Sequence, residues 1–126
     1  MATQKGKILL IEDEKTLSDM YKDKFDEAGY DTDVAFSAED AVDYLKKQKP
    51  DLILLDMLLP RKSGIGFLEE LKKTTDISGI PIVGFSNYDD PETKKKAFEL
   101  GVKDYLLKTQ YTPQQILEKI KQYLKQ

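Results

Sequence analysis

The chain has 126 residues, with 20 Lys or Arg, 23 Asp or Glu and a formal net charge of −3. That length fits one domain, residues 1–126, and is long enough to bury a real hydrophobic core. Cysteine and histidine are absent, which excludes disulfides, thiolate chemistry and the most frequent general base and zinc ligand. Any chemistry must depend on carboxylates, hydroxyls and lysines.

The charge pattern and the polar start of the chain also bear on location and partners. A near-even mix of charges provides no basic surface for nucleic acid, so no direct contact with nucleic acid is expected. No apolar run approaches the roughly 20 residues that span a bilayer. We therefore expect no membrane insertion and a cytoplasmic location. The chain ends about where its last amphipathic helix does, so we also expect it to signal by protein contact alone.

Five short apolar or alternating runs predict strands. In chain order they are residues 7–11, 31–35, 51–55, 80–85 and 102–107. The segments that follow them have helical spacing and begin with cap residues such as Ser37, Asp90 and Thr112. Strands that alternate with helices predict an α/β fold, a doubly wound five-stranded parallel sheet with helices on both faces.

The ends of four predicted strands carry side chains capable of chemistry. Glu12 and Asp13 follow the first strand, Asp56 the third, Ser86 the fourth and Lys108 the fifth. Each has a plain structural explanation, such as a helix cap, a turn residue or a solvated lysine. Because parallel strands end at one edge of a sheet, however, the pattern predicts that three acids, a hydroxyl and a cation converge there.

Three converging carboxylates suit a hard divalent cation. Mg²⁺ prefers oxygen ligands and binds through one or two carboxylates with waters and phosphate oxygens. A carboxylate can also act as the nucleophile that forms an aspartyl phosphate. With Lys108 and Mg²⁺ neutralising phosphoryl oxygens and Ser86 bonding to one, the set is interpreted as a phosphoryl acceptor site.

The segments ILLIEDE, DLILLDMLLPRKSGIGFLEEL, GIPIVGFS and AFELGVKDYLLK resemble, in this order, the receiver domain of two-component response regulators. The resemblance covers essentially the whole chain and implies the flavodoxin-like (βα)5 fold of the chemotaxis regulator, with strand order 2-1-3-4-5. It implies a signalling domain that is not a turnover enzyme, in which Asp56 accepts phosphate from a sensor histidine kinase or phosphotransfer protein.

The resemblance also implies roles for the other residues. Glu12, Asp13 and Asp56 would hold Mg²⁺ together with the backbone carbonyl of Met57. Lys108 would contact the phosphoryl group. Ser86 and Tyr105 would form a switch pair that changes a protein-binding surface on the fourth helix, fifth strand and fifth helix, for a downstream protein target. On that surface the exposed lysines of the fourth helix, residues 94–96, are a candidate docking site.

The sequence departs from the family pattern at several positions. Thr109 stands where a proline in a cis peptide usually follows the lysine, which casts doubt on the loop into the fifth helix. Asn87 replaces a small residue after the switch hydroxyl. Leu58 and Tyr88, the second residues after Asp56 and Ser86, are bulky and carry no acid or amide to orient water, so a long-lived phosphorylated state is predicted.

Rival functions fit less well. A phosphatase of the haloacid-dehalogenase type needs a second acid two residues after the nucleophile, where this chain has Leu58. A flavodoxin-like nucleotide site needs a glycine-rich phosphate loop after the first strand, where IEDE would repel phosphate. The remaining alternative is a receiver-like interaction module that does not accept phosphate.

Overall fold

Helices and strands alternate along the whole described chain. The computed structural model describes residues 6–59 and 62–124. Its elements in chain order are β1 Lys7–Ile11, α1 Lys15–Glu27, β2 Asp31–Ala35, α2 Ala38–Lys47, β3 Leu52–Asp56, α3 Gly64–Thr74, β4 Ile82–Ser86, α4 Pro91–Glu99, β5 Asp104–Leu107 and α5 Pro113–Lys121. Within these described ranges, no helix has the length and apolar content needed to span a bilayer.

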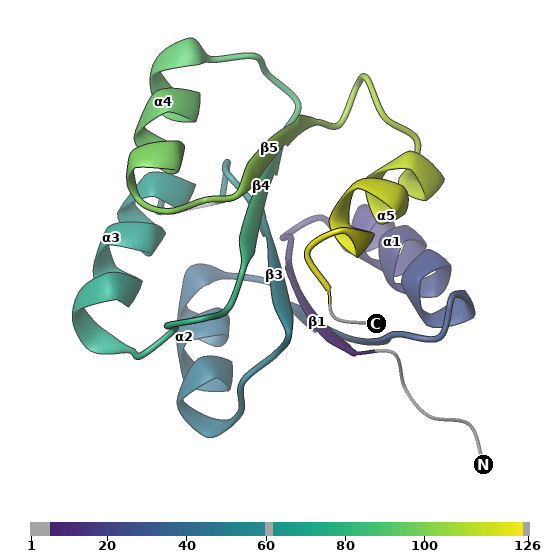
Figure 1. Ribbon diagram of the computed structural model, residues 1–126, viewed down its shortest axis with the longest axis horizontal. Coiled ribbons are helices and arrows are strands. Elements are labelled where there is room, and N and C mark those ends of the chain that lie inside the picture. The colour runs from purple at the N-terminus through teal and green to yellow at the C-terminus, as the bar shows by residue number, and fades with distance from the viewer. Residues whose placement is uncertain (1–5, 60–61, 125–126) are drawn as a thin grey trace.

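The strands form one parallel sheet in the order β2-β1-β3-β4-β5 (Figure 1). Helices α1 and α5 cover one face of the sheet, and α2, α3 and α4 cover the other. This arrangement confirms the predicted doubly wound fold and its strand order. It brings the carboxyl ends of all five strands to one edge of the sheet, where β1 and β3 are neighbours.

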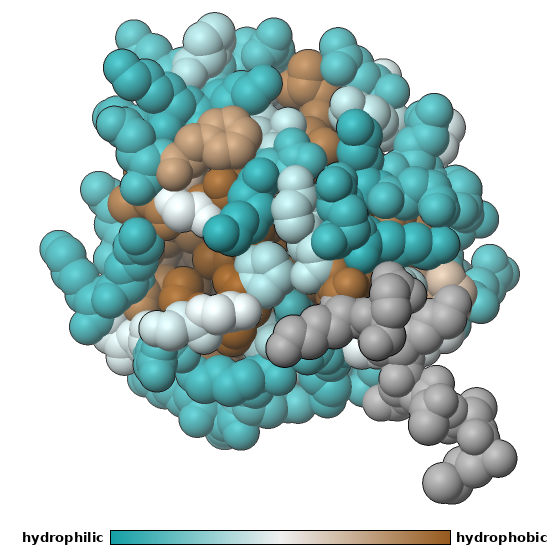
Figure 2. Space-filling view, viewed as in Figure 1, coloured by the Kyte–Doolittle hydropathy of each residue, from teal (hydrophilic) through white to brown (hydrophobic). Residues whose placement is uncertain are grey.

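Side chains alternate between two cores along each strand. On β1, Ile8 and Leu10 pack toward α1 and α5, whereas Leu9 and Ile11 pack toward the opposite helices. Strands β3 and β4 are buried at every position, which explains why their sequences lack a polar alternation. In Figure 2, hydrophobic side chains are seen mainly in recesses of a largely hydrophilic surface.

The predicted helix starts are confirmed. The Ser37 hydroxyl accepts the Asp40 N–H at 3.1 Å, and the Asp90 carboxylate accepts the Glu92 N–H at 3.2 Å. Thr112 forms a capping box with Gln115, because each side chain accepts the other residue's N–H. These caps fix the points at which the chain leaves the site edge of the sheet and enters α2, α4 and α5.

Strand boundaries differ slightly from prediction. Strand β3 extends through Asp56, and β4 begins at Ile82 rather than at residue 80. Ile80 donates its N–H to the carbonyl of Ile77 in a turn, and Pro81 has no N–H to donate. The ladder therefore starts after the proline. Strand β5 likewise begins at Asp104 rather than at residue 102.

Side chains bind backbone groups on both outer strands of the sheet. On β2, Lys22 Nζ donates to the carbonyl of Thr32 at 2.7 Å, and the Thr32 N–H donates to Asp26 Oδ1 at 3.2 Å. On β5, the Tyr105 N–H donates to Asp104 Oδ1 at 2.9 Å. The contacts on β2 also attach α1 to the edge of the sheet.

Candidate phosphoryl acceptor site

The predicted acids do converge at the carboxyl edge of the sheet. Glu12 and Asp13 follow β1, and Asp56 is the last residue of the adjacent strand β3. One carboxylate oxygen from each of the three lies within 4.8 Å of the others. Glu12 and Asp56 are buried, whereas Asp13 is exposed. The group therefore opens to solvent on the Asp13 side, as an ion-binding cleft requires.

Lys108 joins two of these acids. Its Nζ lies 2.6 Å from Glu12 Oε1 and 3.2 Å from Asp56 Oδ2. The three side chains are 7%, 1% and 6% exposed, respectively. Burying a charge is costly unless it is paired, and here one ammonium offsets part of the repulsion between two carboxylates.

The surroundings of Glu12 and Lys108 shift the pKa values of both side chains. Burial raises the pKa of Glu12 above its ordinary value of 4.5, although the hydrogen bond from Lys108 acts in the opposite direction. Burial by itself would lower the pKa of Lys108, but the hydrogen bond to Glu12 and the charge of Asp56 more than offset this and raise it above 10.5. Lys108 is thus a permanent cation beside the acids at neutral pH.

Backbone amides hold the acids in place. The Leu58 N–H donates to Asp56 Oδ1 at 2.9 Å, which leaves Asp56 Oδ2 directed at Lys108. The Glu14 N–H donates to Glu12 Oε2 at 3.2 Å. Helix α1 has Glu14 as its N-cap without a side-chain cap bond, so Glu12 and Asp13 do not serve as its cap residue.

Met57, whose carbonyl was a predicted metal ligand, is tightly packed. That carbonyl accepts the Gly64 N–H at 2.9 Å. A Cβ on Gly64 would lie 2.8 Å from the Met57 Cα, and one on Gly84 would lie 3.0 Å from the Met57 Sδ. The two glycines therefore make room for Met57 beneath the site. One lone pair of the Met57 carbonyl is already used, and the second is left for a ligand.

The predicted switch residues lie on adjacent strands. Ser86 ends β4 and accepts the Tyr88 N–H on its hydroxyl at 3.2 Å. Tyr105 on β5 is 7% exposed, which is more buried than the half-buried packing that its sequence context alone would give. Burial raises the pKa of the Tyr105 hydroxyl, and its contact with Ser86 acts in the opposite direction. The Tyr105 side chain thus points inward, toward Ser86.

A hollow of about 500 Å³ lies beside the switch pair, between the β3–α3 connection and α4. Ser86 and Tyr105 line it together with Leu58 and Tyr88, which are 53% and 67% exposed. In this state neither bulky residue is packed into the core. Asn87 and Thr109 are exposed, and none of the peptide bonds within the described ranges is cis, that between Lys108 and Thr109 included.

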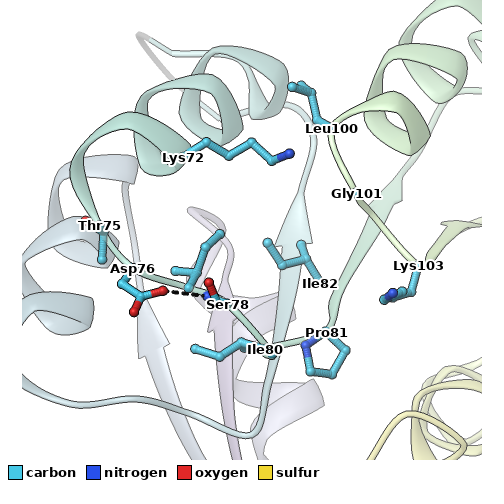
Figure 3. A pocket seen from close by; sticks show the side chains of 12 residues that line it. Lys72, Thr75, Asp76, Ser78, Ile80, Pro81, Ile82, Leu100, Gly101 and Lys103 are labelled. Carbon is cyan, nitrogen blue, oxygen red and sulfur yellow. Dashed lines mark hydrogen bonds between the residues drawn. The ribbon is translucent and has the colours of Figure 1, made fainter.

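A second hollow, of about 620 Å³, lies at the opposite edge of the sheet (Figure 3). It is formed by the end of α3, the segment before β4 and the turn before β5. Lys72 reaches from α3 toward Leu100, and Ile82 lies on β4 below them in this view. The three acids do not line this hollow, so it has no part in the acceptor site.

The sequence interpretation missed the aromatic side chains beneath the acids. Lys108 Nζ lies 4.5 Å from the centroid of the Phe85 ring, and Tyr21 packs edge-on against that ring with centroids 5.6 Å apart. The sequence predicts only that Tyr21 and Phe85 are core residues. The single available signal was that Phe85 directly precedes Ser86 at a strand end.

Comparison with known proteins places the chain in a family. The model of the response regulator receiver domain matches residues 8–121, and the chain belongs to this family of signalling domains from two-component systems. The probable transcriptional regulator ycf27 of Porphyridium aerugineum is 31% identical over 122 residues, which are 97% of this chain and 49% of that protein. The chain thus spans about half the length of this curated relative.

Solved structures agree with this assignment. The receiver domain of the Francisella response regulator 1452 is 30% identical with a TM-score of 0.83, over 94% of this chain and 95% of that one. The chemotaxis response regulator CheY4 of Vibrio cholerae has a TM-score of 0.86 over 97% of this chain and 100% of that chain. Its identity is 23%, so this likeness shows the fold alone.

Proposed function

We propose that Asp56 accepts a phosphoryl group from the phosphohistidine of a sensor histidine kinase or a phosphotransfer protein. The observation that carries the proposal is the environment of Asp56, a buried carboxylate 3.2 Å from Lys108 with oxygens of Glu12 and Asp13 within 4.8 Å. A buried acid with a cation and two further acids around it fits a charged, transient ligand better than a structural ion pair.

In the proposed reaction, an oxygen of Asp56 attacks phosphorus while the bond from phosphorus to the histidine nitrogen breaks. The electron pair of that bond goes to the imidazole, which leaves with a proton from solvent. Lys108 offsets the negative charge on the phosphoryl oxygens, and the Ser86 hydroxyl donates a hydrogen bond to one of them. Attack by water later releases phosphate and regenerates the carboxylate.

We propose Glu12, Asp13 and Asp56 as the residues that hold Mg²⁺, with the Met57 carbonyl as a backbone ligand. The donor set fits, because the three carboxylates supply oxygens within 4.8 Å of one another and hard cations prefer such ligands. When bound, Mg²⁺ neutralises phosphoryl oxygens. The hydrogen bond from Gly64 to the Met57 carbonyl would be shared with the metal, which makes this carbonyl the weakest member of the set.

Intact-mass measurement tests the acceptor. The wild-type chain is incubated with acetyl phosphate and Mg²⁺ beside Asp56→Asn and, as a matched control, Asp19→Asn, which changes an exposed aspartate on α1. We expect the mass of one phosphoryl group on wild type and on Asp19→Asn, and none on Asp56→Asn. An unmodified wild-type mass would favour the interaction module that does not accept phosphate.

The output of the site is proposed to be a change in the surface formed by α4, β5 and α5. Ser86 and Tyr105 connect the two regions, because Ser86 ends β4 and the inward Tyr105 side chain lies on β5, next to the hollow that α4 also lines. A phosphoryl group that recruits the Ser86 hydroxyl changes the surroundings of Tyr105. This surface would then bind a downstream protein.

Amide chemical shifts with and without acetyl phosphate test the switch. We expect changes at Tyr105 and at the exposed lysines 94–96 of α4, as well as around Asp56. Shift changes confined to the acid cluster would contradict the switch while leaving the acceptor role intact. The same spectra of Asp56→Asn provide the unphosphorylated control.

A further inference from the structure

Two kinds of contact hold the Lys108 ammonium, one with carboxylates and one with an aromatic ring. The carboxylates of Glu12 and Asp56 bind its ammonium at 2.6 and 3.2 Å, and the Phe85 ring lies 4.5 Å from the same nitrogen. The Lys108 side chain is 7% exposed. A cation over the face of an aromatic ring is attracted by the ring quadrupole, most strongly where water is excluded.

The Phe85 ring is itself held in place. Phe85 is fully buried in β4, where it is the register partner of Asp56 and its carbonyl accepts the Met57 N–H at 3.0 Å. The Tyr21 ring packs edge-on against the Phe85 ring, with an angle of 67° between the two ring planes. Strand β3, which carries Asp56, and the Phe85 ring, which contacts Lys108, therefore form one rigid unit.

We infer that Phe85 is a positioning residue for phosphoryl transfer, which acts by keeping the Lys108 ammonium over the acceptor. This inference rests on the proposed function. The carboxylates that now hold Lys108 are the same groups proposed to hold the metal, and a metal would reduce their pull on the ammonium. The ring is not a metal ligand, so its attraction persists when the carboxylates are occupied and opposes movement of the lysine toward solvent.

A double-mutant cycle tests whether Phe85 acts through Lys108. Phosphorylation of Asp56 by saturating acetyl phosphate is measured for Phe85→Leu in the wild-type and Lys108→Met backgrounds. We expect Phe85→Leu to slow the wild-type reaction by about tenfold and to have little effect once Lys108 is absent. Equal losses in both backgrounds would show a merely structural role and overturn the inference.

A matched control separates this role from loss of core volume. Phe25 is also fully buried and lies in the same aromatic cluster, with its ring 6.1 Å from that of Tyr21. We expect Phe25→Leu to phosphorylate at the wild-type rate. Should Phe85→Leu fail to fold, fluorinated phenylalanines at position 85 keep the ring shape while weakening its negative face. The rate should then fall with each added fluorine, and an unchanged rate would overturn the inference.

A readout without phosphate keeps the two proposals distinguishable. Because Lys108 lies over the ring, its terminal methylene protons should show an upfield ring-current shift that Phe85→Leu removes and Phe25→Leu retains. If this shift is absent from the wild-type spectrum, the positioning contact is wrong. A wild-type chain that shows the shift but takes up no phosphate would overturn the proposed function, and with it this role. Normal phosphorylation of Phe85→Leu would overturn the positioning role alone.

Discussion

The Lys108 ammonium lies closer to Glu12, at 2.6 Å, than to Asp56, at 3.2 Å. The lysine therefore neutralises a proposed metal ligand at least as directly as it does the proposed acceptor. A divalent cation bound by these acids would therefore compete with Lys108 for the same carboxylate charge, and the two cations would repel each other.

This competition predicts that Lys108→Met binds Mg²⁺ more tightly than wild type. Removing one positive charge within a few ångströms should lower the dissociation constant by about tenfold, since a factor of ten corresponds to roughly 1.4 kcal/mol. Titration calorimetry measures the constant directly. Lys103→Met, at an exposed lysine on the opposite edge of the sheet, should leave the constant unchanged. Equal affinity of Lys108→Met and wild type would place the metal away from this lysine.

Mg²⁺ should stabilise the fold by relieving repulsion among the three carboxylates. A ligand present at 100 times its dissociation constant adds about 2.7 kcal/mol to the free energy of unfolding. Thermal melts with and without Mg²⁺ should therefore differ, and Asp13→Asn should reduce the difference. Asp13 is suited to this test because it is exposed and its replacement leaves the core intact. The same shift in both proteins would locate the metal elsewhere.

The pKa of Glu12 predicts how stability depends on pH in the absence of metal. Burial raises this pKa above 4.5, so the folded state binds the proton more tightly than the unfolded state. The resulting stabilisation is present below the unfolded pKa and is lost as pH rises through the folded pKa. Relative to Glu12→Gln, the wild-type free energy of unfolding should fall as pH rises above the ordinary glutamate pKa of 4.5. Urea denaturation in a chelator checks this, and parallel curves would refute it.

Close packing at the start of α3 predicts opposite effects at two glycines. A Cβ on Gly64 would lie 2.8 Å from the Met57 backbone, so Gly64→Ala should lower the free energy of unfolding by about 1–3 kcal/mol. A Cβ on Gly66 would meet nothing nearer than the Ser63 hydroxyl at 3.4 Å. Gly66→Ala should raise stability by up to about 1 kcal/mol, because alanine is the better helix former. Equal effects in urea denaturation would contradict the packing argument.

The lifetime of the phosphorylated state is predicted to be long. The side chains of Leu58 and Tyr88 have no acid or amide that could orient an attacking water, and their backbone N–H groups bind the Asp56 carboxylate and the Ser86 hydroxyl. Both side chains are more than half exposed, so shielding requires that they close over the phosphoryl group. Dephosphorylation is compared between wild type, Leu58→Asn and Tyr88→Ala. If neither substitution speeds the loss of phosphate, both side chains only cover surface.

The convergence of the site residues could be predicted from sequence because it follows from topology. Parallel strands end at one edge, so Asp13, Asp56 and Lys108 had to meet there once the alternation of strands and helices was recognised. The helix caps at Ser37 and Thr112 could be predicted equally well, since capping depends on a few neighbouring residues.

Features that depend on tertiary packing could not be predicted in this way. The contact of Lys108 with Phe85 joins the ends of two strands, and nothing local distinguishes that ring from an ordinary core residue. The inward position of Tyr105 involves its neighbour on the adjacent strand, Gly84, where a Cβ would lie 3.4 Å from the tyrosine ring. The late start of β4 depends on whether Ile80 bonds within a turn or to the next strand.

The side chains bound to the outer strands have a consequence for behaviour at high concentration. At Thr32 on β2, Lys22 and Asp26 already occupy the carbonyl and the N–H, and at Tyr105 on β5 the N–H is taken by Asp104. A strand from another molecule would have to displace these hydrogen bonds and approach buried or charged side chains before it could extend the sheet. The two flanks are thus blocked at these positions against edge-to-edge aggregation.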